Sequence, residues 1–457
     1  MVRRIAIGVL GTGLTILAFH APGNPSVAAR VVIAAFGWAV VLWLLGNVKD
    51  LHVAIGAAVV AFVATGLPFG TSLRAAFNGT TLTIVAAFVI AAAVRRVKLT
   101  EYAIGRLMSK PQTASSAINR VAAATTASVL VIPATSARAA ITLPVVESMA
   151  ERASPEFSKS IRTVVPVVVL TSAGASLLGA GAHIIAVELL QQSAGSSVNF
   201  VQWIMWCAPY ALIATYLSVV VIKHRYLTKA ERSRPLKPVS QTAPGAITRR
   251  QLGVAVVLVL VIAGWITASF VSMDIAVPAV IGTLALMLPP VRAITPVEAM
   301  RAIPWELLAF LCASLVLADI FVASGSACYV VGPLIGGCQS FSDTPWVVVV
   351  LVILISLFAH LFIHSRSARS AVLVPLILPL ATVTGLNPVS LVLASTLAAG
   401  YCLTLPVCAK PLLMYAGHDS FDRGDLLRLS VWLLPLNAGL LSLTAIFLWP
   451  VMGLPIK

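Results

Sequence analysis

The chain has 457 residues, of which 59% are hydrophobic and 10% are charged, and its mean hydropathy is +1.00. A soluble globular chain carries about 25% charged residues, so this composition excludes a soluble domain and predicts an all-α polytopic membrane protein. The net charge of +16 would also suit a nucleic-acid partner, but most basic residues lie in predicted loops, where the positive-inside rule places them. We therefore expect no nucleic-acid partner.

Residues 1–30 allow two interpretations. A basic start, a short apolar core and the triplet Ser26-Val27-Ala28 are typical of a secretory signal peptide. The same residues suit a first membrane span. We favour the span, because everything that follows is membrane-embedded too.

Apolar segments of near-spanning length recur along the chain and predict about eleven transmembrane helices. Their approximate bounds are 5–19, 31–47, 51–68, 80–94, 160–190, 200–222, 252–270, 275–289, 304–322, 388–416 and 428–451. Two further apolar segments, 116–148 and 345–384, are interrupted by Ser, Thr and Arg and look too broken to span. We expect each to return to its own side of the membrane as a re-entrant hairpin.

The basic residues set the predicted orientation. With the N-terminus inside, nearly all loop lysines and arginines fall on the inner side, and only Arg30, Arg74 and Lys457 fall outside. The positive-inside rule then predicts a cytoplasmic N-terminus and an extracytoplasmic C-terminus in the cell (inner) membrane. The polar, basic stretch 223–250 divides the chain into two halves of similar size.

The two predicted hairpins, hairpin 1 (116–148) and hairpin 2 (345–384), share a short motif. Residues 134–144 read ATSARAAITLP and residues 365–375 read SRSARSAVLVP, with the identical pairs Ser136/Ser367, Ala137/Ala368, Arg138/Arg369, Ala140/Ala371 and Pro144/Pro375. Hairpin 1 enters from inside and hairpin 2 from outside, so the halves have opposite orientation. Inverted repeats whose broken helices meet at the midplane are typical of secondary transporters, and free helix N-termini there suit anions.

The spans after the hairpins are also interrupted. The first contains TSAGASLLGAGAHII (171–185) and the second TLPVCAKPLLMYAGH (404–418). Glycine and proline at matching places in two halves predict unwound backbone at a binding site.

Four basic residues lie within these interrupted segments: Arg138, Arg366, Arg369 and Lys410. A charge at the bilayer centre costs about 2.5–3.5 kcal/mol even on the most permissive scale. We interpret the four as a positive midplane pocket for an anion with two or more negative charges. Hydroxyl groups would add donors to this pocket, from Thr135, Ser136, Ser365 and Ser367.

The alternative is that the arginines cap carbonyl groups of broken helices or pair with buried acids. The capping role concerns above all Arg138 and Arg369, because the repeat places them equivalently. Arg366 has Thr135 as its counterpart, and this asymmetry makes Arg366 the sharper candidate for contact with the substrate.

The chain resembles the divalent anion:sodium symporter (DASS) family of the ion transporter superfamily over most of its length. The resemblance lies in these hairpins, the Ile-Pro-Trp segment at 303–305 and the Pro-Val segment at 406–412. The resemblance implies a homodimer that works as an elevator. The scaffold would be 1–112 and 251–343, the moving transport domain 113–224 and 344–457, and the cytoplasmic linker 225–250.

The resemblance also implies site residues. The family's two Ser-Asn-Thr motifs hold substrate carboxylates and help form sodium sites, and they fall on 134–136 and 365–367 here, without the asparagine. The family's late substrate segment includes Ala409 and Lys410, where lysine replaces a proline. A fixed guanidinium repels sodium, so sodium coupling is doubtful, and exchange or proton coupling is the alternative. Candidate ion-coupling residues are His183, Gly179 and Asp319.

We therefore expect secondary active transport of a small di- or trivalent anion, either a di- or tricarboxylate or a sulfate-like oxyanion. The alternatives are a cation/proton antiporter or metalloid-oxyanion exporter of the same superfamily, and a membrane receptor without transport. No enzyme motif and no metal-ligand spacing is present, so we expect no enzyme and no cofactor beyond a coupling Na⁺ or H⁺. Cys328 and Cys338 could form a disulfide near the outer face.

Overall fold

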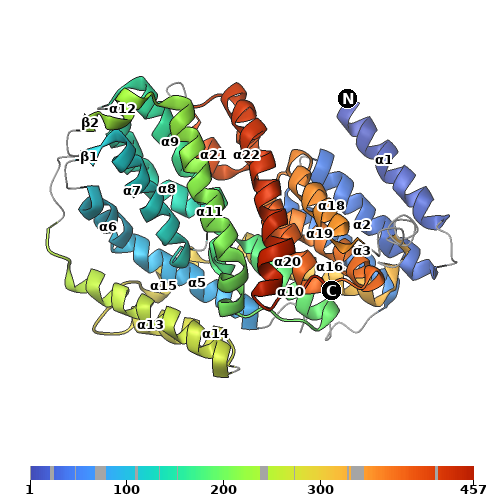
Figure 1. Cartoon of the computed structure of the whole chain (residues 1–457). Coiled ribbons are helices and arrows are strands. Elements are labelled where there is room, and N and C mark those ends of the chain that lie inside the picture. The colour runs from blue at the N-terminus through green and yellow to red at the C-terminus, as the bar shows by residue number, and fades with distance from the viewer. Residues whose placement is uncertain are drawn as a thin grey trace.

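The computed structural model of the chain is almost entirely α-helical, so the predicted all-α fold is confirmed (Figure 1). It describes residues 2–20, 25–46, 48–66, 79–108, 112–132, 134–151, 153–236, 245–271, 273–326, 329–330, 344–416 and 420–457. Cys328 and Cys338, which could form a disulfide, and the outer-loop Arg74 lie outside these described residues.

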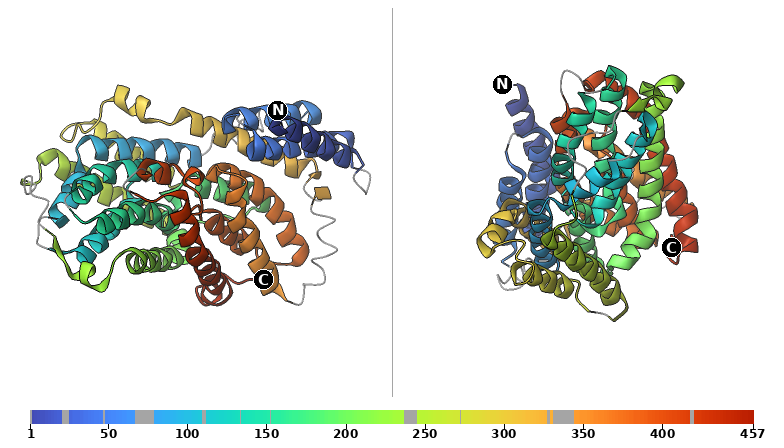
Figure 2. Two further views of the ribbon diagram at one scale, coloured as in Figure 1. Left: turned by 90° about the horizontal axis from the view of Figure 1, so that it is seen from above. Right: turned by 90° about the vertical axis from the view of Figure 1, so that its left-hand side faces the viewer.

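The helices of 1–112 and 251–326 gather along one side of the molecule, where Figure 2 (left) shows them in blue and yellow. One group packs α1, α2, α3 and α16, with bounds Val2–Phe19, Val27–Leu45, Asp50–Thr65 and Trp305–Ala323. The other packs α5, α13, α14 and α15, with bounds Gly79–Arg96, Arg249–Val271, Ala276–Met287 and Pro296–Ala302. Helix α6 (Leu99–Met108) leads on to hairpin 1. The division into scaffold and transport domain concerns movement and stays a prediction.

Both interrupted apolar segments fold as two helices joined by a bend. Hairpin 1 consists of α7 (Ala114–Ala127), the 3-10 turn η1 (Ser128–Leu130) and α8 (Thr135–Ala150). Hairpin 2 consists of α18 (Pro345–Phe358), η5 (Ala359–Leu361) and α19 (Arg366–Thr384). The interruptions therefore lie where the sequence predicts them, and re-entry into the membrane stays a prediction.

The next span in each half is broken as well. In the first half α9 (Pro155–Thr171) is followed by the 3-10 turns η2 (Ser172–Ala175) and η3 (Leu177–Gly179) and by α10 (Gly181–Ala194). In the second, α20 (Pro388–Ala399) is followed by an extended segment, η6 (Pro406–Cys408) and α21 (Lys410–Tyr415). At Gly179 a Cβ atom would clash with the carbonyl oxygen of Ala173, so the tight first break requires glycine.

The pieces of the broken spans pack across the halves. Helix α10 of the first half lies against α19 of hairpin 2, and α21 of the second half lies against α8 of hairpin 1. Tyr415 of α21 donates its hydroxyl to the carbonyl oxygen of Ala139 at 3.1 Å and shares a 2.9 Å hydrogen bond with the hydroxyl of Thr142. Each hairpin is thus held by the other half of the chain.

Two long helices, α11 (Phe200–Tyr226) and α22 (Arg423–Leu443), lie side by side in the middle of the molecule (Figure 1). A π-helical turn, η7 (Thr444–Leu448), and α23 (Trp449–Val451) continue α22. The indole of Trp449 donates to the carbonyl oxygen of Trp206 at 2.8 Å. This contact fixes the C-terminal end of α22 to α11.

The start of the predicted linker is attached to hairpin 1. Strand β1 (Gln112–Thr113) pairs antiparallel with β2 (Pro235–Leu236), and α12 (Lys229–Ser233) precedes β2. Lys223, near the end of α11, donates to the amide oxygen of Asn119 in α7 at 2.8 Å. The first part of the linker is therefore ordered against the hairpin.

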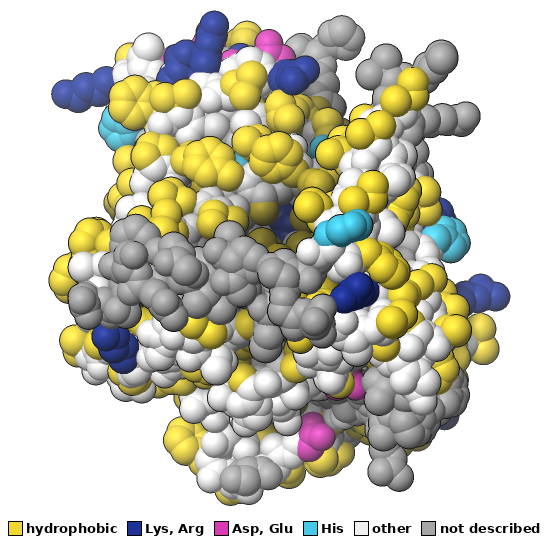
Figure 3. All heavy atoms as spheres, turned by 90° about the vertical axis from the view of Figure 1, so that its right-hand side faces the viewer, with side chains coloured by type: hydrophobic (Ala, Val, Ile, Leu, Met, Phe, Trp, Pro, Cys, Tyr) yellow, Lys and Arg dark blue, Asp and Glu magenta, His cyan; other side chains and the backbone are white. Residues whose placement is uncertain are grey.

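Six of the described helices are long and apolar enough to cross a membrane by length and composition: α2, α11, α13, α16, α19 and α22 continued by α23. Hydrophobic side chains cover much of the face shown in Figure 3, and basic side chains lie at its upper edge and at scattered points below. These features are those of a multi-pass membrane protein. The number of about eleven spans and the orientation of the termini stay predictions.

Candidate functional site

Arg138, in the first turn of α8, is fully buried and bonded on all sides. Its guanidinium donates to the carbonyl oxygens of Thr125 and Val169 at 2.7 and 3.2 Å, and to the hydroxyls of Ser128 and Ser172 at 3.1 and 2.7 Å. Thr125 and Val169 lie in the last turns of α7 and α9, where carbonyls lack helical partners and the helix dipole is negative. Arg138 therefore ties hairpin 1 to the first break.

Arg369 makes the corresponding contacts in the second half. It is fully buried in the first turn of α19, and its two Nη atoms donate to the carbonyl oxygen of Tyr401 and to the sulfur of Cys402. Both partners lie in the break after α20, although the Nε atom of Arg369 has no partner among the described residues. The contacts of Arg138 and Arg369 are those of the capping interpretation.

The two breaks also share a backbone conformation. Ser176 and Leu405, before the 3-10 turns, have φ/ψ of −134°/140° and −133°/144°. Ala180 and Ala409, before α10 and α21, have −155°/147° and −153°/135°. Neither helix has a side-chain N-cap, but Pro411 in the first turn of α21 has no N–H to offer.

Arg366 differs from the two capping arginines. It is the first residue of α19, directly after Ser365, whose side chain caps the helix by accepting from the N–H of Ala368. The Nε and Nη1 atoms of Arg366 are buried and have no hydrogen-bond partner in the described residues. No ion pair found there includes Arg366 either. A buried, unpaired guanidinium is energetically costly, and an anion in contact with it would balance its charge.

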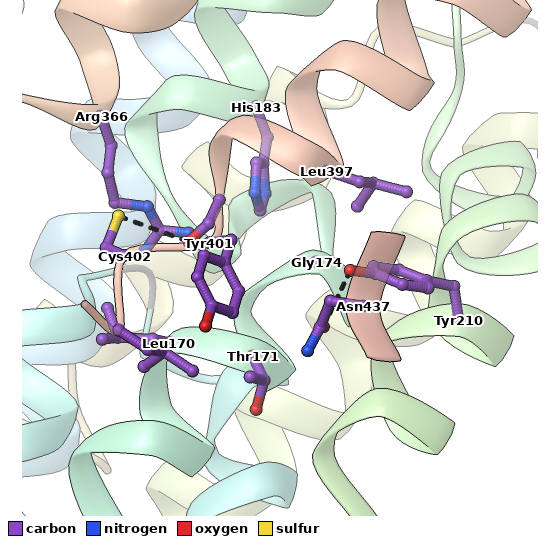
Figure 4. A pocket seen from close by; sticks show the side chains of 12 residues that line it. Leu170, Thr171, Gly174, His183, Tyr210, Arg366, Leu397, Tyr401, Cys402 and Asn437 are labelled. Atoms are coloured by element: carbon purple, nitrogen blue, oxygen red, sulfur yellow. Dashed lines mark hydrogen bonds between the residues drawn. The ribbon is translucent and has the colours of Figure 1, made fainter. Parts of the chain in front are cut away.

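The guanidinium of Arg366 reaches a cavity between the two breaks (Figure 4). The cavity is lined by Leu170, Thr171, Gly174, His183, Tyr210, Arg366, Leu397, Gly400, Tyr401, Cys402, Leu403 and Asn437. Its volume of ≈ 20 Å³ holds about one water molecule, so a larger anion requires the wall to move. None of the lining residues is acidic.

His183 is held rigidly at the edge of this cavity. It is 1% exposed, its Nδ1 lies 3.1 Å from the carbonyl oxygen of Ser176, and its ring stacks on that of Trp203 at 4.9 Å between centroids. A carbonyl oxygen can only accept, so Nδ1 carries the proton of the neutral ring. Trp203 in turn donates to the carbonyl oxygen of Gly174 at 3.0 Å, which fixes both rings to the first break.

The hydroxyl residues of the hairpins do not line the cavity. Thr135, Ser136 and Ser367 are half-buried at the starts of α8 and α19. The hydroxyl of Ser367 lies 3.7 Å from the position of a Cβ atom built on Gly181. The start of hairpin 2's second arm therefore meets the start of α10.

Other predicted site residues lie apart from Arg366. Lys410 begins α21 with an exposed side chain, and Ala409 before it is buried. Asp319 is half-buried in α16, within the group of α1 to α3. Gly179 belongs to the first break but does not line the cavity. The structure thus brings together Arg366 and His183.

Sequence reasoning missed a buried hydrogen-bond chain beside the cavity. His360 bonds through Nδ1 to the carbonyl oxygen of Leu357 at 2.5 Å and through Nε2 to the hydroxyl of Thr404 at 2.7 Å. Ser430 donates to Thr404 at 3.1 Å, and Tyr401 donates to Ser430 at 3.1 Å. The chain joins hairpin 2, the second break and α22. For His360, a polar residue in an apolar run was the only available sequence signal.

It also missed Tyr210 and Asn437, which face each other across α11 and α22. The Tyr210 hydroxyl donates to Oδ1 of Asn437 at 3.1 Å at the end of the cavity opposite Arg366 (Figure 4). Only the packing of two distant helices creates this pair, so no local motif marks it.

Two broken spans, two hairpins and a buried cationic cavity define the class of polytopic membrane transporter. The sequence profile of the sodium:sulfate symporter transmembrane region matches residues 3–454. The chain therefore belongs to this family of anion transporters, and the recognition of a DASS-type protein is confirmed.

Similar proteins support this membership. The chain is 26% identical over 300 residues to a citrate/succinate antiporter of Escherichia coli, an alignment of 63% of this chain and 59% of that protein. It is 21% identical over 472 residues to a membrane protein of Cupriavidus necator, covering 96% and 91% of the two chains.

Two solved structures share the fold. The YdaH transporter of Alcanivorax borkumensis has a TM-score of 0.56 at 15% identity, covering 82% of this chain and 85% of that one. MtrF of Neisseria gonorrhoeae, from a class of antimetabolite efflux pumps, has a TM-score of 0.60 at 14% identity, covering 97% and 99%. These likenesses concern the fold alone.

Proposed function

We propose that this chain is a secondary active transporter of a small di- or trivalent anion, a di- or tricarboxylate or a sulfate-like oxyanion. The observation that carries the proposal is the guanidinium of Arg366, which is buried at a helix N-terminus and lacks an acidic partner in the described residues. A planar guanidinium offers paired donors to carboxylate and sulfate oxygens. The free N–H groups at the start of α10 add a positive helix end nearby.

The proposed mechanism is an elevator in a homodimer of the inner membrane. The hairpins, the broken spans, α11 and α22 would move as one body, because Arg138, Arg369 and Tyr415 bind its parts together. Helices α1 to α3, α5 and α13 to α16 would stay in place as the scaffold.

We propose further that the transporter works without sodium. The guanidinium of Arg138 is surrounded by two carbonyl and two hydroxyl oxygens. Oxygens of this kind bind hard cations in proteins, and here a fixed positive charge already occupies the cage. Transport would then run by exchange, as the name of the Escherichia coli relative says of that protein, or by proton coupling.

The rival proposal is a cation/proton antiporter. A cation carrier needs carboxylates at its site, and the cavity at Arg366 has none among its lining residues. A metalloid-oxyanion exporter would bind its substrate through the same anion chemistry. The identity of the transported anion would distinguish it from the proposed transporter.

Counterflow in proteoliposomes tests the proposal. Labelled succinate, citrate and sulfate are offered outside vesicles that contain the same unlabelled anion, with wild type, Arg366→Gln, Arg366→Lys and Arg120→Gln. Arg120 is the matched control, because its guanidinium bonds to the carbonyl oxygen of Leu107 and does not line the cavity.

We expect wild type and Arg120→Gln to exchange at least one of these anions. Loss of a buried charged contact costs about 2 kcal/mol or more, so Arg366→Gln should bind the anion at least about 30-fold more weakly. Arg366→Lys should bind the anion with an intermediate affinity, since lysine keeps the positive charge but not the paired donors of the guanidinium. If none of the anions moves with wild type, the substrate class is wrong, and unchanged exchange by Arg366→Gln would refute the role of Arg366.

A further inference from the structure

The charge balance of the cavity is incomplete for a divalent anion. Arg138 binds carbonyl and hydroxyl groups around the first break, Arg369 binds a carbonyl group and a sulfur at the second, and the side chain of Lys410 is exposed. Among the residues that the structure describes, Arg366 is thus the one cationic residue that lines the cavity. It neutralises one negative charge of a dianion, and a second positive group is needed in an environment that excludes water.

His183 stands where this second charge is required. Its ring and the guanidinium of Arg366 reach into the same cavity (Figure 4). Because Nδ1 is bound to the carbonyl oxygen of Ser176, the ring can gain a proton only at Nε2. The stacked ring of Trp203 and the bond to Ser176 hold the imidazole in place whether it is neutral or charged.

We propose that His183 is the proton-coupling residue, which takes up one proton when a divalent anion binds beside Arg366 and releases it with the anion on the other side. This inference rests on the proposed anion transport and identifies the proton gradient as its driving force. Without the anion, the charge of Arg366 opposes a second positive charge on His183. With the anion between them, both positive charges are balanced.

Among the described residues, no carboxylate of the cavity wall can pair with a protonated His183 in place of the bound anion. On the elements packed around it, the titratable or charged groups that line the same cavity are Tyr210 of α11, Arg366 of α19, and Tyr401 and Cys402 of the second break. The other such groups on these elements do not line it: Arg369 of α19, Glu306, Cys312 and Asp319 of α16, and Cys207, Tyr216, Lys223, His224, Arg225 and Tyr226 of α11. Neither acid lines the cavity, and Glu306 pairs with Lys49. On α10 itself, Glu188 faces a separate cavity of ≈ 630 Å³ beside α5 and α13. No carboxylate of the cavity wall therefore competes with the bound anion for the imidazolium.

Binding and transport give two independent tests. Sulfate and succinate binding to purified wild type is measured by titration calorimetry at about pH 7 and about pH 8, in buffers of different ionisation enthalpy. We expect uptake of about one proton per anion and an affinity about tenfold lower at the higher pH. His183→Asn should bind the anion more weakly and without proton uptake. Wild type that binds either anion without taking up a proton would overturn the inference.

The transport test uses a pH gradient, acid outside, with no anion inside the vesicles. Wild type should accumulate labelled succinate, whereas His183→Asn, which lacks the second positive charge, should not, and its counterflow at equal pH should be weaker than that of wild type. His360→Asn is the matched control, because His360 is equally buried but outside the cavity, with both nitrogens bonded; it should keep the gradient-driven accumulation. Gradient-driven accumulation by His183→Asn would contradict the coupling role. Counterflow by wild type tests the proposed function separately.

Discussion

Replacing Arg366 by methionine should separate stability from function. The guanidinium is buried, and its Nε and Nη1 atoms have no hydrogen-bond partner in the described residues. Its removal therefore abolishes the free-energy cost of burying a charge and breaks no hydrogen bond at those atoms. A charge at membrane depth costs about 2.5–3.5 kcal/mol, and methionine fills much of the same volume. We therefore expect Arg366→Met to be about 2 kcal/mol more stable than wild type in the absence of anions.

The assay is thermal unfolding of the purified protein in detergent, with and without succinate or sulfate. An anion that binds only the folded wild type at about 100 times its Kd adds about 2.7 kcal/mol of stability. Arg366→Met should gain none of this. The reasoning is refuted if Arg366→Met is less stable than wild type without the anion, or if the anion stabilises both proteins equally.

Three further predictions concern the other basic residues and sodium. Arg138→Met should lower the unfolding free energy by about 2–7 kcal/mol, because it removes four hydrogen bonds that each contribute about 0.6–1.7 kcal/mol in membrane proteins; thermal unfolding that matches wild type would contradict the capping role. Replacement of Na⁺ by K⁺ should leave succinate uptake into proteoliposomes unchanged, and a strict sodium requirement would contradict the sodium-independent mechanism. Lys410→Gln should keep counterflow, because the side chain is exposed outside the cavity, and a loss as large as that of Arg366→Gln would place Lys410 in the site.

The sequence predicts the interruptions well because they leave local signals. Hydroxyl residues and arginine break the apolar runs of both hairpins, and glycine or proline marks both breaks. Each signal reflects a backbone requirement of a few neighbouring residues, such as the glycine needed at Gly179.

The direction in which each basic side chain points could not be predicted in the same way. Arg138 and Arg366 lie within a few residues of the starts of equivalent helices, yet one binds carbonyls of α7 and α9 and the other reaches the cavity. Their partners come from segments far away in the chain. Lys410 reads as a midplane charge in the sequence, but the first position of α21 leaves its side chain exposed.

Polar residues from distant helices were the hardest to foresee. Tyr210 and Asn437 meet only because α11 and α22 cross in the middle of the molecule. The chain from His360 through Thr404 and Ser430 to Tyr401 joins three separate elements. Neither arrangement has a spacing or composition that a single sequence reveals.

The most direct test of the anion site is an experimental structure of the protein with bound succinate or sulfate. The account predicts ligand density between the two breaks, with oxygens at about 2.7–3.2 Å from the guanidinium nitrogens of Arg366 and with Arg138 still bonded to Thr125 and Val169. An anion bound away from Arg366, with that guanidinium still unpaired, would contradict it.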